Sequence, residues 1–263
     1  MSTVLKSWYD FPQYYDLAFR DETKREADFF ESAFSKYARR PVRRVLEPAC
    51  GSGRLVAEMA RRGYALEAFD LSEPSLAYLR RRLRRRSLDA HVFQADMTDF
   101  RLSRPVDAAF CTMNTVRHLL TERAARSHLE AVARAVRPGG LYILGLHVFP
   151  PDADNECVER WTARHGSTRV TVTLRAKPLD LKKRLEQIDI SMRVHTRRES
   201  FRLVNSFPLR TYTADQLRRL IRSVRQWELV DVFDFWYDID EPLELDEEIS
   251  DTVLVLRRQK AAT

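Results

Sequence analysis

The stretch that decides the fold is RRVLEPACGSGRLVAEMA, residues 43–60. A short apolar run ends at Glu47, two glycines follow at Gly51 and Gly53, and a helical pattern begins at Arg54. A strand, a glycine turn and a helix in this order leave backbone N–H groups free at the start of the helix, where they can bind a ligand. Several cofactors use such a turn, so the rest of the chain has to distinguish them.

Predicted strands and helices alternate around this turn. The apolar runs over 64–71, 90–96, 106–113 and 140–149 are predicted strands, and 72–86 and 121–136 are predicted helices. A helix over 213–224 is followed by strands over 227–235 and 251–258, which close the chain as a hairpin pair. Apolar strands that alternate with helices are typical of a parallel sheet covered on both faces. We therefore predict an α/β fold: a doubly wound, Rossmann-like sheet of seven mostly parallel strands with an antiparallel last strand.

Two segments differ in pattern from this core. Residues 11–37 carry aromatic side chains at helical spacing, which predicts one or two helices. After Pro150 and Pro151, apolar residues alternate with polar ones, which predicts a small antiparallel β insertion with one wet face. The predicted domains are an N-terminal helical cap over 1–40, a cofactor-binding core over 41–149, the β insertion over 150–212, and residues 213–263, which complete the core sheet.

Composition narrows the class of protein. The chain has 263 residues, of which 44% are hydrophobic and 32% charged, as in ordinary soluble domains. It has no apolar run long enough for a membrane span and no apolar region near its start typical of a secretory signal, so we expect a cytoplasmic protein without a membrane partner. Its cysteines, Cys50, Cys111 and Cys157, are widely spaced, which predicts reduced thiols rather than a metal site. The net charge of +7 leaves nucleic acid open as a partner, and a homodimer also stays open.

The chemistry at the strand ends selects among the cofactors. The phosphate-binding P-loop pattern is absent, and the nicotinamide fingerprint fails because Val56 stands where its third glycine belongs. S-adenosylmethionine (SAM) has no phosphate, but it carries a cationic methionine end, a ribose diol and an adenine. Glu47 can neutralise the cation, Asp70 after the second strand can accept both ribose hydroxyls, and Asp96 after the third can accept from the adenine amino group. These acids follow strands of one parallel sheet, at the edge where such sheets bind ligands.

These residues resemble the motifs of class I SAM-dependent methyltransferases, with the match covering residues 43–147. The first motif of that family corresponds to Glu47, Ala49, Gly51 and Gly53, with Ala49 in place of the first glycine. Asp70 with Leu71 is similar to the next motif, and Asp96 with Met97 is similar to the adenine-binding motif. The resemblance implies SAM as cofactor, the β insertion as a substrate domain, and the segment QYYDL, residues 13–17, as a closure over the methionine end. Tyr15 would then contact the cofactor, and Tyr14 would lie by the substrate.

Residues near the last core strands are the candidates for the methyl acceptor. Asn114 is expected to contact the cofactor through its backbone or side chain. His118 and His147 are the candidate catalytic bases or substrate ligands, because both follow strands at the binding edge. The predicted lining of the acceptor pocket comes from the insertion and the last loop, with Arg210, Tyr212, Trp236 and Tyr237.

Three functions stay open from the sequence. The main hypothesis is methyl transfer to a nitrogen or oxygen atom of a small molecule. The alternative is an RNA or protein methyltransferase that docks through the basic helix around Arg80–Arg86, although the Asn/Asp-Pro-Pro-Tyr/Phe motif of enzymes that methylate exocyclic amines of bases is absent. The third is a non-catalytic module that binds the cofactor, which the intact acids and glycines disfavour. The acidic stretch 238–248 would repel a polyanion if it lay near the site.

Overall fold

The computed structural model describes residues 2–150, 156–180 and 182–260. Its larger sheet has seven strands in the order β11-β12-β6-β5-β2-β3-β4. These strands are β2 (Arg44–Pro48), β3 (Ala65–Asp70), β4 (His91–Gln94), β5 (Val106–Cys111), β6 (Val136–His147), β11 (Trp227–Phe233) and β12 (Asp251–Arg258). The pairs among β2 to β6 are parallel, while β12 runs antiparallel to both β6 and β11. The predicted doubly wound sheet with an antiparallel last strand is therefore confirmed.

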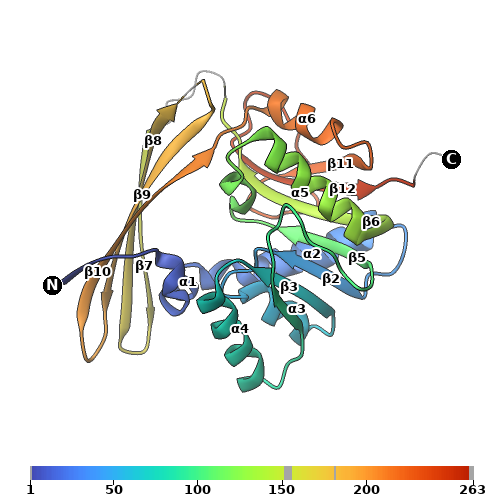
Figure 1. The fold of residues 1–263 in the computed structure, drawn as a ribbon. Coiled ribbons are helices and arrows are strands. Elements are labelled where there is room, and N and C mark those ends of the chain that lie inside the picture. Colours follow the sequence, from blue (N-terminus) through green and yellow to red (C-terminus); the bar gives the residue numbers. More distant parts are fainter. Residues whose placement is uncertain (1, 151–155, 181, 261–263) are drawn as a thin grey trace.

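Helices cover both faces of this sheet (Figure 1). On one face lie α2 (Thr23–Tyr37), α3 (Arg54–Arg61) and α4 (Glu73–Arg85), and on the other α5 (Glu122–Ala135) and α6 (Ala214–Arg222). Neighbouring strand residues point to opposite faces: Val45 packs with the first group of helices and Leu46 with the second. Each face therefore has its own hydrophobic core, which is why the strands are apolar throughout.

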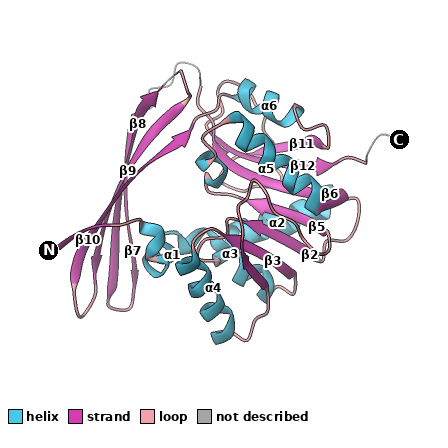
Figure 2. Ribbon diagram, in the orientation of Figure 1, coloured by secondary structure: helices cyan, strands magenta, loops and turns pink. Residues whose placement is uncertain are grey.

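The β insertion forms a second sheet. Its strands are β7 (Cys157–His165), β8 (Thr168–Asp180), β9 (Leu185–His195) and β10 (Ser200–Arg210), all paired antiparallel in sequence order. An N-terminal strand that the sequence did not predict, β1 (Ser2–Leu5), adds to its edge parallel to β10. Figure 2 shows α1 (Pro12–Phe19) lying between the two sheets, whereas the other labelled helices flank the larger one.

The first forty residues are divided between the two sheets. Trp8 in the short 3₁₀ helix η1 (Trp8–Asp10) and Leu17 in α1 pack in the core of the smaller sheet. Phe29 and Phe30 in α2 pack in the core of the larger sheet. A second 3₁₀ helix, η2 (Arg20–Glu22), joins α1 to α2. This segment therefore bridges the sheets instead of forming a body of its own.

A third 3₁₀ helix, η3 (Thr115–His118), follows β5 and also contacts the smaller sheet. Here Arg117 forms a buried ion pair with Glu186 of β9. The carboxyl ends of β2, β3 and β5 meet in the region that α1, η1 and η3 enclose, and this is where the site lies.

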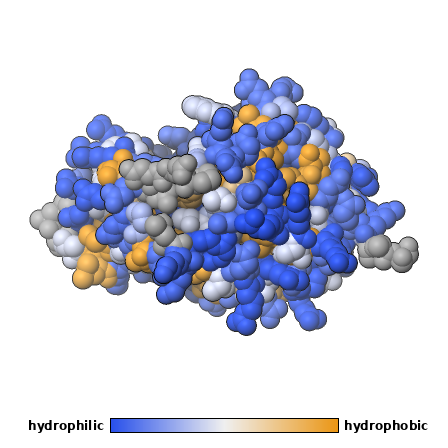
Figure 3. All heavy atoms as spheres, turned by 90° about the horizontal axis from the view of Figure 1, so that it is seen from above, coloured by the Kyte–Doolittle hydropathy of each residue, from blue (hydrophilic) through white to orange (hydrophobic). Residues whose placement is uncertain are grey.

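The surface of the protein is polar on the face shown in Figure 3, where hydrophobic residues form small separate patches. Within the described ranges, no helix combines the length and apolar character needed to cross a bilayer. The same residues contain no cluster of three or more His, Cys, Asp or Glu side chains arranged to hold a metal ion.

Candidate functional site

The turn after β2 takes left-handed backbone conformations that shape the site. Gly51 and Gly53 have φ of 53° and 67°, and Ala49 has φ of 51° although it is not glycine. A Cβ atom at Gly53 would overlap the side chain of Leu79 in α4, so the glycine permits close packing of α4 on the turn. The turn therefore brings backbone N–H groups at the start of α3 to the carboxyl ends of the strands.

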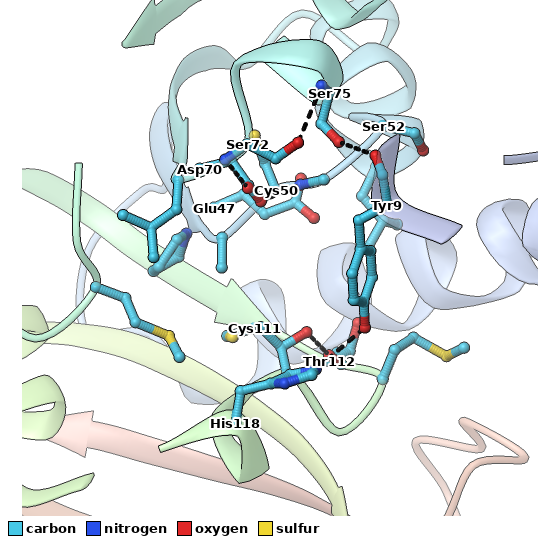
Figure 4. Close-up of a pocket in the computed structure, with 18 of the residues that line it drawn as sticks. Tyr9, Glu47, Cys50, Ser52, Asp70, Ser72, Ser75, Cys111, Thr112 and His118 are labelled. Atoms are coloured by element: carbon cyan, nitrogen blue, oxygen red, sulfur yellow. Dashed lines mark hydrogen bonds between the residues drawn. The ribbon is translucent and has the colours of Figure 1, made fainter. Parts of the chain in front are cut away.

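A cavity of about 330 Å³ lies against this turn. Figure 4 shows Tyr9 and His118 meeting at one end of it, with Asp70 and Ser72 at the other. The structure places here seven of the ten residues predicted to bind the cofactor: Tyr15, Glu47, Ala49, Gly51, Asp70, Leu71 and Met97.

Glu47 supplies a buried carboxylate at the cavity wall. Its side-chain atom Oε2 is buried and accepts no hydrogen bond from any described residue. Burial raises the pKa of Glu47 to about 8, while the nearby positive charge of Arg54 acts to lower it. A buried acceptor without a partner is costly, and an ammonium group in the cavity would satisfy it. Glu47 therefore favours a cationic group in this cavity.

Asp70 is held rigidly at the end of β3. Its two carboxylate oxygens accept backbone N–H groups from Gly51 and Ser72, both at 2.8 Å. Burial raises its pKa, and these N–H groups oppose the shift. Each oxygen keeps acceptor capacity beyond its one hydrogen bond, so the carboxylate fits a ribose diol in the cavity.

Three of the predicted cofactor residues do not line this cavity. Asp96 is exposed and accepts hydrogen bonds from the backbone N–H and the hydroxyl of Thr98, both at 2.7 Å, although its neighbour Met97 lines the cavity. Gly53 lies on the side of the turn that packs against Leu79 of α4. Asn114 lies in a second cavity, where its Oδ1 accepts the backbone N–H of His147 at 2.7 Å.

The second cavity has a volume of about 530 Å³ and lies between the two sheets. It is lined by residues of η1, α1, η2 and α2, of η3 and β6, of β7 to β10, and of the loops after β5 and β11. Four residues line both cavities: Tyr9, Tyr15, Met113 and His118. The two spaces therefore adjoin at these side chains.

His118 lies at this boundary between the two cavities. Its Nε2 is 3.1 Å from the hydroxyl of Tyr9. Burial, together with the positive charge of Arg117, lowers the pKa of His118 to about 4, so its imidazole is neutral at pH 7. No pattern in the sequence indicated Tyr9. Its η1 segment lies beside α4, where the hydroxyl of Ser75 donates to the Tyr9 carbonyl at 3.3 Å.

Two other predicted residues line the second cavity. His147 is one of them, with its Nδ1 2.6 Å from Asp251 Oδ1. Tyr237 is the other, and it is buried.

Four predicted substrate residues lie outside both cavities. Tyr14 packs on the rings of Phe11 and Phe201. Arg210 is buried in a network with Glu122, and Tyr212 is fully buried beside it. Trp236 is 74% exposed, on the outer surface. Residue type suggested contact with substrate, whereas packing directs these side chains elsewhere.

A buried ion pair beside Glu47 was missed by the sequence analysis. Arg54 Nη1 lies 2.5 Å from Glu26 Oε1, and Thr112 donates its hydroxyl to Glu26 Oε2 at 2.8 Å. Arg54 lines the first cavity, and Glu26 balances its charge there. Glu26 and Arg54 are charged residues at buried positions of two different helices. The helical pattern of the sequence does not show that they contact each other.

Comparisons with known proteins agree with this site. Residues 45–140 match the family model described as a methyltransferase domain. A dTDP-3-amino-3,6-dideoxy-alpha-D-glucopyranose N,N-dimethyltransferase of Streptomyces fradiae is 32% identical over 127 residues, which are 48% of this chain and 48% of that protein. The chain thus spans about half the length of the curated relatives it matches.

Solved structures extend the likeness of fold to nearly the whole chain. A SAM-dependent methyltransferase from Clostridium acetobutylicum superposes with a TM-score of 0.77 at 17% identity, covering 96% of this chain and 99% of that one. A SAM-bound amino pentose methyltransferase from Micromonospora echinaspora gives a TM-score of 0.71 at 19% identity, covering 98% of this chain and 100% of that one. The family model identifies a methyltransferase domain over residues 45–140, and the solved structures confirm the predicted fold.

Proposed function

We propose that the protein transfers a methyl group from SAM to a nitrogen or oxygen atom of a small molecule. Its residues 45–140 match a methyltransferase domain, and its fold is shared with SAM-dependent methyltransferases. The observation that carries the proposal is one cavity with Glu47 and Asp70 in its wall that adjoins a second, larger cavity through Tyr9, Tyr15 and His118. A cofactor space and an acceptor space in contact are what direct methyl transfer needs.

The first cavity suits SAM by the charge and the polarity of its lining. Glu47 would hold the ammonium, because its buried Oε2 accepts no hydrogen bond from the described residues. Asp70 would accept the ribose hydroxyls, and Leu71 and Met97 would pack on the adenine, since both line the cavity with apolar side chains. Asp96, one residue from Met97, would reach the adenine amino group if its side chain left Thr98.

Bound SAM supplies a methyl group on a sulfonium, which is already a good leaving group. The protein therefore has to align the acceptor and exclude water rather than activate the leaving group. Tyr9 and Tyr15 line both cavities with ring centres 5.4 Å apart, so their rings would pack beside the reacting groups. His118, neutral at pH 7, accepts a hydrogen bond from the acceptor group. This hydrogen bond orients the lone pair of the acceptor atom toward the methyl group. Asn114 and His147 lie on the acceptor side of this boundary.

A small-molecule acceptor is supported by the curated relatives. The Streptomyces fradiae relative is named for N,N-dimethylation of an amino sugar, and a relative from Streptomyces venezuelae is named for the same reaction on a related sugar. The second cavity is enclosed between two sheets of this chain, which suits a molecule of metabolite size rather than a macromolecule.

Two of the arginines of α4 form ion pairs within the chain, whereas Arg81, Arg84 and Arg85 are exposed. Arg82 forms a buried ion pair with Asp16, and Arg80 pairs with Glu73 at 2.7 Å. These contacts stabilise the helix in place. Nucleic-acid binding and a homodimer stay predictions from the sequence.

The test uses the protein with methyl-labelled SAM and separate pools of small metabolites, RNA and cellular protein. We expect label to enter the small-molecule pool and calorimetry to detect S-adenosylhomocysteine binding. Label that enters only RNA or protein would replace the proposal with its alternative, and an absence of cofactor binding would overturn it.

A further inference from the structure

The second cavity is acidic in a basic protein. The chain as a whole carries a net charge of +7, yet the cavity lining contains three carboxylates, Asp21, Glu22 and Glu159, and one arginine, Arg25. Asp251 adds a further carboxylate behind His147. Carboxylates therefore outnumber cationic side chains in the lining of this space, which favours a cation.

The arginines near this cavity contact other side chains of the chain. The guanidinium of Arg25 lies 5.7 Å from the ring centre of Trp236. Arg54 pairs with Glu26, and Arg117 pairs with Glu186. A diphosphate needs guanidinium or ammonium donors that can turn to it. Among the described residues that line this cavity, Arg25 is the only Lys or Arg side chain.

The remaining wall is mostly apolar and aromatic. Rings from the smaller sheet, from the N-terminal segment and from the loop after β11 contribute, among them Phe19, Trp161, Phe207 and Phe235. Phe19 and Trp161 contact each other with ring centres 5.5 Å apart. Such a wall buries an apolar body and offers an aromatic surface to a cation.

We infer that the acceptor is an amine carried on an apolar scaffold without phosphate, cationic in solution, rather than a sugar linked to a nucleoside diphosphate. This inference rests on the proposed function and specifies its acceptor. The Streptomyces fradiae relative is named for a dTDP-linked sugar, so this chain would combine a similar domain with a different acceptor chemistry. The carboxylates attract the ammonium to the cavity, and the rings bind the body that carries it.

The transfer step balances with this acceptor. The ammonium first gives its proton to water at the rim, where Asp21 and Glu159 are exposed. The amine nitrogen then forms a bond to the methyl carbon with its lone pair, while the bond from that carbon to sulfur breaks and sulfur keeps the electron pair. With the proton of the neutral imidazole on Nε2, where it donates to the Tyr9 oxygen, His118 Nδ1 is the unprotonated nitrogen that accepts an N–H of the amine and orients its lone pair.

The experiment measures binding of three probes to the protein saturated with S-adenosylhomocysteine. The first is dansylcadaverine, an apolar fluorophore that carries a primary ammonium on an alkyl arm. The second is its N-acetylated form, which keeps the apolar body and loses the charge, and the third is thymidine diphosphate. We expect the amine to bind about tenfold more tightly than its acetylated form, and thymidine diphosphate not to displace it. Equal binding of the two dansyl probes, or displacement by thymidine diphosphate, overturns the inference.

Variants test whether the carboxylates are responsible. Glu22→Gln combined with Glu159→Gln should reduce the preference for the charged probe to about twofold or less. The matched control is Glu130→Gln, which removes an acid from the exposed face of α5, where it pairs with Arg126 at 2.9 Å. The control should keep the full preference. A preference that survives in the double variant contradicts the role of the acids.

The two proposals fail in different ways. If S-adenosylhomocysteine does not bind, the proposed function fails, and the inference fails with it. If S-adenosylhomocysteine binds and label from SAM enters phosphorylated sugars but no apolar amine, the function stands and only the acceptor class is wrong.

Discussion

The hydroxyl of Tyr9 lies 3.1 Å from Nε2 of His118, and this contact joins the N-terminal segment to η3 between the two cavities (Figure 4). Both residues line both cavities. The backbone of Tyr9 is held on α4 through Ser75, while His118 follows the buried Arg117. The position of His118 in the site therefore depends on a residue more than a hundred positions away in the chain.

Replacing Tyr9 by Phe keeps the ring and removes its contact with His118. We expect kcat to fall about tenfold, because His118 loses the partner that fixes the imidazole, while the affinity for S-adenosylhomocysteine changes less than about threefold. Initial-rate kinetics and calorimetry measure the two effects. Tyr14→Phe is the matched control, since Tyr14 lies outside both cavities, and it should change neither quantity. Equal losses in the two variants would show that the hydroxyl of Tyr9 has no special role.

Glu47 predicts a dependence of cofactor affinity on pH. Without ligand its pKa is about 8, against an ordinary value of 4.5. An ammonium favours the carboxylate, so binding releases a proton wherever the free protein holds one. Affinity for S-adenosylhomocysteine should therefore rise from pH 6 to pH 8 and then level off. Glu47→Gln should remove this rise and weaken binding about tenfold or more at pH 8. Calorimetry across this pH range decides, and a wild-type affinity that is flat with pH contradicts the assignment.

The same pKa shift predicts the stability of the ligand-free protein. A carboxyl group whose pKa is raised by folding stabilises the folded state below pH 4.5, and this contribution is lost as pH rises through about 8. Glu47→Gln carries no charge to bury, so its melting temperature should exceed that of the wild type at pH 8 and approach it at pH 5. Thermal denaturation at both values is the measurement. The loss of affinity and the gain in stability together would separate a binding role from a structural one.

Asp70 and Asp96 allow a comparison of two predicted cofactor acids. Asp70→Ala removes a cavity carboxylate held by Gly51 and Ser72, and we expect it to weaken S-adenosylhomocysteine binding at least about tenfold with the fold intact by circular dichroism. Asp96→Ala removes a carboxylate that bonds only Thr98 in this structure, and we expect a loss of about threefold. Calorimetry on both variants gives the ranking. An unchanged affinity in Asp70→Ala would reject the ribose contact.

The sequence predicted the first cavity well because its residues follow strand ends. Glu47 and Asp70 come directly at the carboxyl ends of strands, and neighbouring parallel strands place such residues together whatever surrounds them. The seven-stranded sheet followed from the same alternation. These are local patterns, and they depend little on distant contacts.

The second cavity could not be predicted in the same way. Tyr9 enters the site because residues 2–5 pair with β10, about two hundred positions later, which no local pattern encodes. Arg210 and Tyr212 were chosen by residue type, but Arg210 donates to the carbonyl of Leu120 at 2.9 Å and is buried with its neighbour. Whether a polar side chain lines a cavity or forms hydrogen bonds within the core depends on packing between the sheets, which the linear sequence does not show.

The ion pair of Arg117 and Glu186 predicts how strongly the two sheets are joined. Both side chains are almost fully buried, and Arg117 also donates its Nε to the carbonyl of Arg210 at 2.8 Å. Arg117→Met would leave Glu186 buried without its cation, so we expect the free energy of unfolding to fall by about 3–5 kcal/mol. Adding Glu186→Leu removes the buried charge and should recover most of that loss. Urea denaturation of the wild type and both variants measures these values.

Arg126→Met is the control for this series. Arg126 forms an exposed pair with Glu130 one helical turn away, and such pairs contribute only about 0.3–0.5 kcal/mol. The measured outcome could be that the free energy of unfolding of Arg117→Met falls no further than that of the control. Such a result would mean that Glu186 binds water or a proton when its partner is removed. If instead Glu186→Leu fails to rescue Arg117→Met, the hydrogen bond to Arg210 matters more than the charge pair. In that case the junction of the sheets depends on the orientation of the guanidinium rather than on neutralisation of Glu186.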